Sequence, residues 1–270
     1  MKLAVSTIAW ANEEEKDIAM LLRGLGVEYV EVAPTKIWAD PTKASDSEME
    51  DYKQFWRTYG IEIVAIQSML FSRPDLKIFE NEDNRKATLE YLKDFIVISG
   101  KLGAKRMVFG SPKNRQRGGI SLANAMDIAV PFFRELARTA QESDVIFCIE
   151  PNAPQYACDF ITTAKEGIDL VRVVDAPGFA LHLDTACMTL AGDNIAESVG
   201  LAGKSLKHFH ISAPMLVAVN EESQVDHESA ADMLHEIDYD GYASIEMRPA
   251  AKGNLERVRE AIAFAQDTYL

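Results

Sequence analysis

The chain has 270 residues, of which 47% are hydrophobic and 26% charged, so it is long enough to form one large core. Its 42 acidic and 28 basic residues give a formal net charge of −14, which argues against a nucleic-acid-binding surface. No signal-peptide pattern opens the chain, and no apolar run approaches the roughly 18 residues of a membrane span. The sequence therefore predicts a cytoplasmic protein with neither a nucleic-acid nor a membrane partner.

Apolar runs and helical patterns alternate along the N-terminal half. Strands are predicted at Lys2–Trp10, Tyr29–Ala33, Ile61–Gln67 and Arg106–Phe109. Helices are predicted at Glu13–Leu25, Ser47–Tyr59, Glu82–Leu102 and Leu122–Glu142. In the third of these helices the apolar residues recur on one face, and Gly103 follows as a terminator.

The C-terminal half repeats the same alternation. Its predicted strands lie in the runs VIFCIEPN, FALHLDTA, LKHFHISA and YASIEMRP, and its helices are predicted near residues 163–174, 194–201 and 228–237 and from residue 254. Eight strand–helix units without a linker or a shift in composition predict a single (β/α)₈ TIM barrel over residues 1–270. Active sites of such barrels lie at the carboxyl ends of the strands.

Each of the last four predicted strands ends in a potential metal ligand, namely Glu150, Asp184, His210 or Glu246. Successive spacings are 34, 26 and 36 residues, and one strand–helix unit needs roughly 30. Parallel neighbouring strands would therefore bring all four side chains to one end of the barrel. Any single one could instead cap a helix or belong to a buried ion pair, but four in succession favour a metal site.

Three oxygen ligands and one imidazole favour a divalent ion, with Mn²⁺ first and Mg²⁺, Co²⁺ or Zn²⁺ next. Such an ion acidifies the proton beside a carbonyl group and stabilises the enediolate that forms when this proton is removed. Glu150 and Glu246, three strands apart, could serve as base and acid. Together with the family resemblance described next, this chemistry predicts an isomerase or epimerase acting beside a carbonyl group.

The segments EP, LDT, HFHIS and SIEM, in this order and spacing, resemble the xylose isomerase-like barrel superfamily of sugar isomerases and epimerases. In the ketose 3-epimerases of that superfamily, Glu, Asp, His and Glu on the last four strands hold a divalent metal, and the two glutamates move protons. The resemblance implies the same roles for Glu150, Asp184, His210 and Glu246, and a sugar or sugar phosphate as substrate.

Three positions depart from the epimerase pattern. Cys187, Leu216 and Tyr156 stand where the resemblance would place a substrate-binding His, an Arg and a further Glu. The metal ligands are therefore kept while the sugar-reading side chains differ. The N-terminal segments EVAPTKIW, AIQSMLF and FGSPKNR resemble sugar phosphate isomerase/epimerase-like proteins. This resemblance does not indicate a particular substrate.

Another branch of the superfamily cuts DNA at abasic sites with three zinc ions. Its pattern needs two early histidines, but strands three and four end here in Gln67 and Gly110. Position 187 is Cys, and the late pair Asp226-His227 lacks the intervening residue of the pattern. These residues cannot build the three-metal site.

Further candidates surround the four ligands. His182 and His208 each lie two residues before a ligand, so we expect them on the same face of the strand but one layer deeper, where they would hydrogen-bond to the ligands and orient them or form part of the hydrogen-bonded core. Substrate contacts are expected from residues at strand ends and in the following loops: Trp10, Glu31, Gln67, Lys113, Arg115, Cys187 and Arg248. For Trp10, ordinary packing at the barrel mouth is an equal alternative.

Basic residues gather at the predicted barrel mouth in an otherwise acidic chain. Lys113, Arg115 and Arg117 follow strand four, while Lys36 and Arg248 follow strands two and eight. They could hold a phosphate or carboxylate of the substrate, or simply pair with neighbouring carboxylates.

Two other classes of function remain open on the sequence. The barrel could be a metal-dependent sugar lyase or dehydratase, or a non-catalytic sugar-binding protein. The sequence is compatible with a homo-oligomer and sets no number of subunits.

Overall fold

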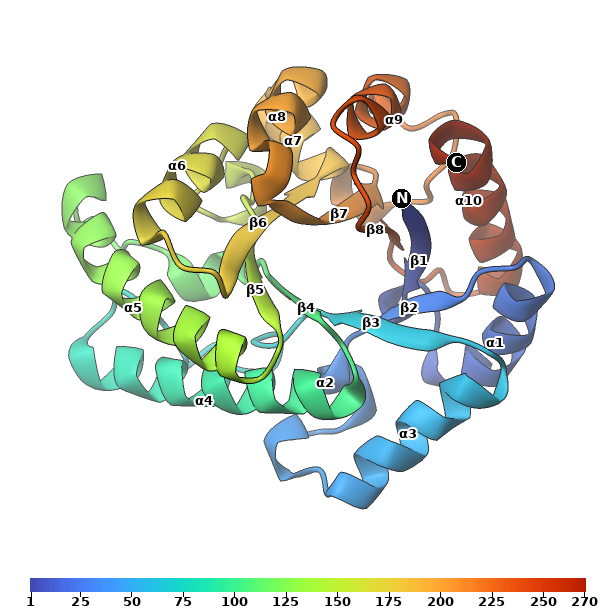
Figure 1. Cartoon of the computed structure of the whole chain (residues 1–270), viewed down its shortest axis with the longest axis horizontal. Coiled ribbons are helices and arrows are strands. Elements are labelled where there is room, and N and C mark those ends of the chain that lie inside the picture. The colour runs from blue at the N-terminus through green and yellow to red at the C-terminus, as the bar shows by residue number, and fades with distance from the viewer.

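The computed structural model describes all 270 residues, which form a closed barrel of eight parallel strands surrounded by helices (Figure 1). The strands pair in chain order, and β8 closes onto β1. Their bounds are β1 Lys2–Ser6, β2 Tyr29–Val32, β3 Glu62–Ile66, β4 Arg106–Phe109, β5 Ile146–Ile149, β6 Phe179–Asp184, β7 Leu206–Ser212 and β8 Tyr242–Glu246. The predicted (β/α)₈ TIM barrel is confirmed.

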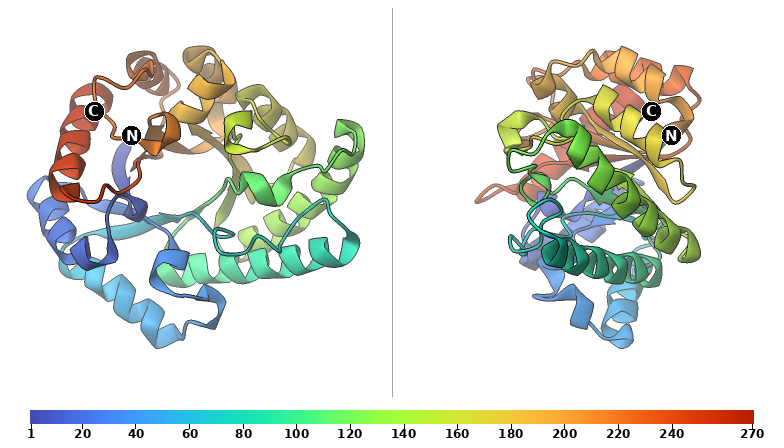
Figure 2. Two further views of the ribbon diagram at one scale, coloured as in Figure 1. Left: turned by 180° about the vertical axis from the view of Figure 1, so that it is seen from behind. Right: turned by 90° about the vertical axis from the view of Figure 1, so that its left-hand side faces the viewer.

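The helices form an outer layer around these strands, and the two chain ends lie close together on one side of the barrel (Figure 2). Their bounds are α1 Glu15–Gly24, α2 Pro34–Ile37, α3 Asp46–Thr58, α4 Glu82–Leu102, α5 Leu122–Glu142, α6 Ala164–Val174, α7 Thr185–Ala191, α8 Ile195–Ala202, α9 His227–Glu236 and α10 Asn254–Tyr269. None of them combines the length and the apolar character needed to cross a membrane.

Local capping explains why α4 has the bounds that the sequence predicts. The Asn81 side chain accepts a 2.8 Å hydrogen bond from the backbone N–H of Asn84, which satisfies a free donor of the first turn. Gly103 ends the helix with φ of 89°, a left-handed conformation that glycine adopts without strain. Between these caps, Phe95 and Ile96 are fully buried, so the apolar face packs toward the barrel.

Two short helices, α2 and α7, are not predicted by the sequence pattern. The side chain of Asp184, the last residue of β6, accepts a hydrogen bond from the backbone N–H of Cys187 and so caps α7. Pro34 occupies the first turn of α2, where its missing N–H is not needed. Both helices follow a strand directly at the carboxyl end of the barrel, so they shape the mouth above the predicted site.

Candidate metal centre

The four predicted metal ligands lie on consecutive strands at one end of the barrel. Glu150 directly follows β5, Asp184 ends β6, His210 lies near the end of β7, and Glu246 ends β8. These strands are parallel neighbours, and Asp184 is in register with His210. All four side chains are buried, with at most 8% of any of these residues exposed. The barrel thus places three carboxylates and one imidazole in a small volume.

The two ring nitrogens of His210 have different surroundings. Its Nε2 lies 2.8 Å from Oε2 of Glu31, so the proton is best placed on Nε2. Its Nδ1 has no hydrogen-bond partner, although it is buried, and it faces Oε2 of Glu246 at 3.3 Å and Oδ2 of Asp184 at 3.7 Å. Although burial opposes it, the carboxylates of Glu31 and Glu246 raise the pKa of His210 well above its usual value. Nδ1 and the carboxylates of Glu246 and Asp184 thus converge on one small volume, whose negative charge a proton on Nδ1 or a bound cation would balance.

Asp184 combines a structural role with a position in the cluster. Its Oδ1 accepts the capping hydrogen bond from Cys187 at 2.6 Å, and its Oδ2 accepts one from the Ser212 hydroxyl at 2.6 Å. One oxygen of Asp184 therefore caps a helix, which is the alternative role that the sequence analysis left open. The second oxygen points toward His210 and remains close enough to join a metal site.

Glu150 reaches the cluster because its neighbours leave space for it. A Cβ atom added to Gly110, directly after β4, would lie 2.2 Å from Oε2 of Glu150, so any side chain at this position would require Glu150 to move. Burial, followed by the charges of Asp184 and Glu246, raises the pKa of Glu150 to about 8. Burial and Glu246 likewise raise the pKa of Asp184. The carboxylates lack sufficient positive charge around them, which a divalent cation would supply.

The ligand atoms present at this site fit a divalent metal ion. Ligand atoms of Glu150, Asp184 and His210, together with His182, lie within 4.8 Å of one another, and Glu246 adjoins them through His210. This buried His/Glu/Asp cluster suggests a divalent metal site. His182 is an additional candidate ligand, since both of its ring nitrogens are buried without a partner.

A second layer of polar side chains lies beneath the cluster. Glu31 accepts hydrogen bonds from Nε2 of His208 at 3.2 Å and of His210 at 2.8 Å. Although burial opposes it, these two imidazoles hold the pKa of Glu31 well below its usual value. Burial lowers the pKa of His182 well below its usual value, which favours a neutral ring. Glu31 is thus a buried carboxylate that orients His210.

A cavity of about 230 Å³ opens onto the cluster. Residues from five segments line it: Gly110, Ser111, Pro112, Glu150, Asn152, Tyr156, Asp184, Cys187, Leu216 and Glu246. The three residues that depart from the epimerase pattern, Cys187, Leu216 and Tyr156, all face this cavity. Their side chains replace an imidazole, a guanidinium and a carboxylate, so the cavity wall is less charged than the pattern implies.

A family model described as xylose isomerase-like TIM barrel matches residues 20–268. The chain belongs to this family. It is a xylose isomerase-like TIM barrel with a buried His/Glu/Asp cluster.

Curated relatives of this barrel match over part of their length. The chain is 35% identical over 82 residues to D-psicose 3-epimerase of Ruminiclostridium cellulolyticum, which covers 30% of this chain and 28% of the relative. It is 30% identical over 118 residues to D-psicose 3-epimerase of Enterocloster bolteae, covering 44% of this chain and 38% of the relative. The matched segments thus span well under half of each relative.

A solved structure shares the fold over the full length. It is a crystal structure of D-psicose 3-epimerase in the presence of D-fructose, with a TM-score of 0.83 and 19% sequence identity over 100% of this chain and 99% of that chain. This xylose isomerase-like barrel therefore has the fold of a sugar epimerase from end to end.

Three residues predicted to contact substrate are fully buried, and the prediction is corrected for them. Glu31 lies beneath His210, as described above. Trp10 packs its ring against Trp56, with ring centroids 6.3 Å apart, so it belongs to the core. Arg115 donates hydrogen bonds to the backbone carbonyl of Glu150 at 2.6 Å and to Oδ1 of Asn152 at 2.8 Å. It supports the loop after β5 from behind.

The predicted ring of basic residues does not form at the barrel mouth. Lys36 donates to the backbone carbonyl of Trp10 at 2.6 Å, and Arg117 donates to that of Asp159 at 2.6 Å. Arg248 donates to the backbone carbonyl of Met215 at 2.6 Å, so it holds the loop that carries Leu216. Of these five residues, Lys113 alone is exposed with neither a hydrogen bond nor an ion pair to the protein, whereas Arg115 is buried.

Gln67 lies beside the site rather than in the metal cavity. Its Nε2 donates a 2.7 Å hydrogen bond to the Ser6 hydroxyl, and 5% of the residue is exposed.

Two residues of the site, Asn152 and Ser212, have no role in the sequence-based prediction. Asn152 lines the cavity and donates to Sγ of Cys187 at 3.5 Å, and Ser212 binds Asp184. Each lies two residues after a predicted ligand, and for Ser212 in β7 this period-two spacing along a strand is the signal that could have identified it.

Proposed function

We propose that this chain is a divalent-metal-dependent epimerase or isomerase that acts beside the carbonyl group of a sugar. The observation that carries the proposal is the convergence of Nδ1 of His210 with the carboxylates of Glu246 and Asp184 inside a buried cluster. Glu150, Asp184, His210 and Glu246 would hold the ion, which is Mn²⁺ by preference and otherwise Mg²⁺, Co²⁺ or Zn²⁺. When bound, the ion polarises the substrate carbonyl and the neighbouring hydroxyl group.

The two glutamates carry the proton transfer in this proposal. One carboxylate removes the proton from the carbon beside the carbonyl, and the C–H electron pair forms a C=C bond while the carbonyl oxygen gains charge. The other glutamate, in its acid form, returns a proton to carbon as the C=C bond reverts to C=O. Since Glu150 and Glu246 follow β5 and β8, three strands apart around the barrel, they approach the substrate from different sides. Delivery to the opposite face inverts the carbon centre.

The epimerase relatives support this reaction type. The residues of the cavity wall support a substrate that differs from the D-psicose named for those relatives. D-psicose 3-epimerases match the chain over partial segments. Leu216 and Cys187 give the cavity an apolar residue and a thiol, and burial followed by Asp184 and Glu150 raises the pKa of that thiol well above its usual value. Apart from the proposed metal ligands Glu150, Asp184 and Glu246, the cavity therefore offers the substrate no charged side chain.

Proton exchange in deuterium oxide tests the proposal. Metal-loaded protein is incubated with a panel of ketoses and ketose phosphates, and deuterium in the recovered sugar is measured by mass spectrometry. We expect incorporation at the carbon beside the carbonyl group, together with an epimer or isomer. Loss of water or cleavage of the sugar would instead assign a dehydratase or lyase. Binding without exchange across the panel would assign a non-catalytic sugar-binding barrel.

A matched pair of variants assigns the proton transfer to Glu246. Glu246→Gln keeps an oxygen that can coordinate the metal but removes the base, so we expect most of the metal to remain and the exchange to fall at least ~100-fold. Glu236→Gln, an exposed change at the end of α9, is the control and should leave exchange unchanged. Wild-type exchange in Glu246→Gln would remove Glu246 from the chemistry.

A further inference from the structure

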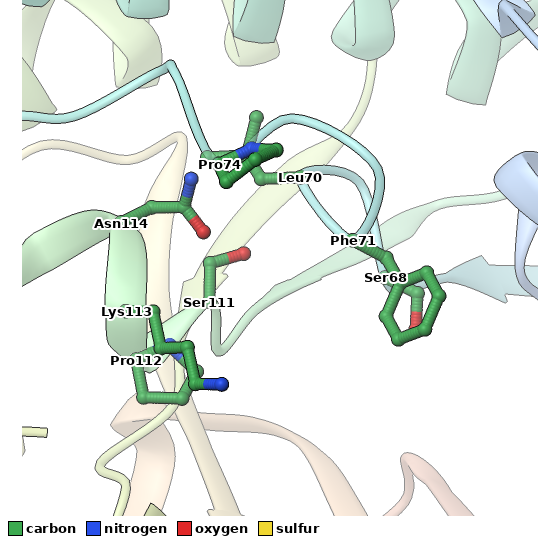
Figure 3. Close-up of a pocket in the computed structure, with 8 residues that line it drawn as sticks. All are labelled: Ser68, Leu70, Phe71, Pro74, Ser111, Pro112, Lys113 and Asn114. Carbon is green, nitrogen blue, oxygen red and sulfur yellow. The ribbon is translucent and has the colours of Figure 1, made fainter. Parts of the chain in front are cut away.

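A second cavity of about 340 Å³ lies at the barrel mouth beside the metal cavity (Figure 3). The loop after β3 contributes Ser68, Leu70, Phe71 and Pro74, and the loop after β4 contributes Ser111, Pro112, Lys113 and Asn114. Ser111 and Pro112 line both cavities, so the two adjoin along one wall. At about 230 Å³ the metal cavity alone is smaller than the roughly 300–1,000 Å³ of typical ligand sites, and the pair falls within that range.

Phe71 is the unusual residue of this second cavity. It is 86% exposed, which makes it the most exposed of the large hydrophobic residues in the chain. Figure 3 shows its ring and Ser68 on one side of the cavity, with Ser111, Pro112 and Lys113 on the other. An exposed aromatic ring beside a site is a common platform for an apolar ligand surface.

The two loops are built to hold this geometry. Asn114 is buried, and its Nδ2 donates 2.7 Å hydrogen bonds to the backbone carbonyls of Arg73 and Leu76. Its own carbonyl accepts from the backbone N–H of Ile78 at 3.0 Å. These bonds tie the loop of Phe71 to the loop of Lys113, so the cavity exists before any ligand binds.

Backbone strain marks the same place. Ser68 and Ser111, each two residues beyond the end of β3 or β4, are two of the nine non-glycine residues with positive φ, at 59° and 45°, values that are unfavourable for residues with a side chain. Strain of this kind is retained chiefly at functional sites. The Ser111 hydroxyl and the Lys113 ammonium group make no hydrogen bond or ion pair within the protein, so both are available to a ligand.

We infer that the substrate is a keto sugar bearing a second, uncharged glycosyl residue, whose ring stacks on Phe71 and whose hydroxyls bind Ser111 and Lys113. The inference rests on the proposed function for the reacting half of the molecule. One face of a pyranose ring is lined with C–H groups and packs well on an aromatic ring, while its hydroxyls need donors and acceptors at the edge. An anionic substituent is less well served, because Lys113 is the one free cation here.

Isomaltulose, in which a glucosyl residue is attached to O6 of fructose, tests the inference against fructose and fructose 6-phosphate. The kcat/KM for deuterium incorporation is measured for each with metal-loaded wild type, Phe71→Ala and Leu201→Ala. Leu201 is 62% exposed on α8 and lines neither cavity, so it is the matched control. We expect wild type and control to prefer isomaltulose over fructose about tenfold, and Phe71→Ala to lose that preference with fructose unchanged.

Two outcomes would overturn the inference. One is equal or lower activity on isomaltulose than on fructose, unaffected by Phe71→Ala. The other is a preference for fructose 6-phosphate that Phe71→Ala leaves intact and Lys113→Ala removes. If no sugar exchanges deuterium, the proposed chemistry fails, and saturation-transfer NMR still decides the second site. Tighter binding of isomaltulose than of fructose, with the difference lost in Phe71→Ala, would support the second sugar-binding site. Equal binding of the two sugars would contradict it.

Discussion

Glu31 on β2 and His210 on β7 are joined across the barrel by a 2.8 Å hydrogen bond. The carboxylate fixes which nitrogen of the imidazole carries the proton and turns the other, Nδ1, toward Asp184 and Glu246. Glu31 therefore acts through His210 and has no contact with the cavity. The strands that do not supply metal ligands still determine how a ligand is oriented.

Glu31→Gln should weaken metal binding while the barrel stays folded. The amide is close in size but lacks the charge that favours the required tautomer, and loss of such a partner typically costs 10- to 100-fold in metal affinity, as a rough guide. Competition with a chelator measures the affinity, and circular dichroism checks the fold. Glu62→Gln on the exposed start of β3 is the control. An unchanged affinity in Glu31→Gln would mean that His210 is not a ligand oriented by Glu31.

Gly110→Ala should displace Glu150. The added Cβ would lie 2.2 Å from Oε2 of Glu150 and 3.3 Å from Oδ1 of Asn152, so the glutamate must move. We expect metal occupancy to fall well below one equivalent by elemental analysis. Gly24→Ala, at the end of α1 with no atom within 4 Å of the new Cβ, should bind metal as wild type does. Full occupancy in both variants would contradict the assignment of Glu150 as a ligand.

Arg115→Met and Lys113→Met should differ in stability. Arg115 is fully buried, and its loss leaves the Glu150 carbonyl and Oδ1 of Asn152 without a donor. Each unsatisfied group costs roughly 1–3 kcal/mol, but Nε and Nη1 of Arg115 are themselves buried without a partner and their removal offsets part of this cost, so we expect about 2 kcal/mol less free energy of unfolding. Lys113 is exposed, and its replacement should change that free energy by less than about 0.5 kcal/mol. Urea unfolding measures the free energy of unfolding of both variants. Equal changes in the two would indicate that Arg115 is exposed at the barrel rim, as the sequence analysis expected.

The stability of the fold should decrease as the pH falls from about 6.5 to about 4, in part because of His227. Burial lowers the pKa of this residue from 6.5 to about 4, while its Nδ1 lies 2.6 Å from the Tyr269 hydroxyl. The unfolded chain therefore binds a proton in this window before the folded chain does, and unfolding becomes easier by up to about 3 kcal/mol. Urea unfolding of wild type and His227→Gln between pH 7 and pH 4 should show a shallower slope for the variant. Parallel slopes would show that His227 does not contribute.

The sequence by itself determined the barrel and the place of the cluster. Apolar residues with helical spacing and a terminal glycine defined α4, because capping and periodicity are local properties. Units of about 30 residues predict parallel strands in chain order, and parallel strands bring Glu150, Asp184, His210 and Glu246 to one end.

Only the tertiary structure decided which of the other polar residues face the substrate. Glu31 points into the barrel beneath His210, and Arg115 turns behind the loop after β5, although both lie at or just beyond strand ends in the sequence. Phe71 and Lys113 meet across one cavity because buried Asn114 ties their two loops together. The rotation of a strand about its axis and the path of a loop depend on packing between segments far apart in the chain, and no local pattern encodes that packing.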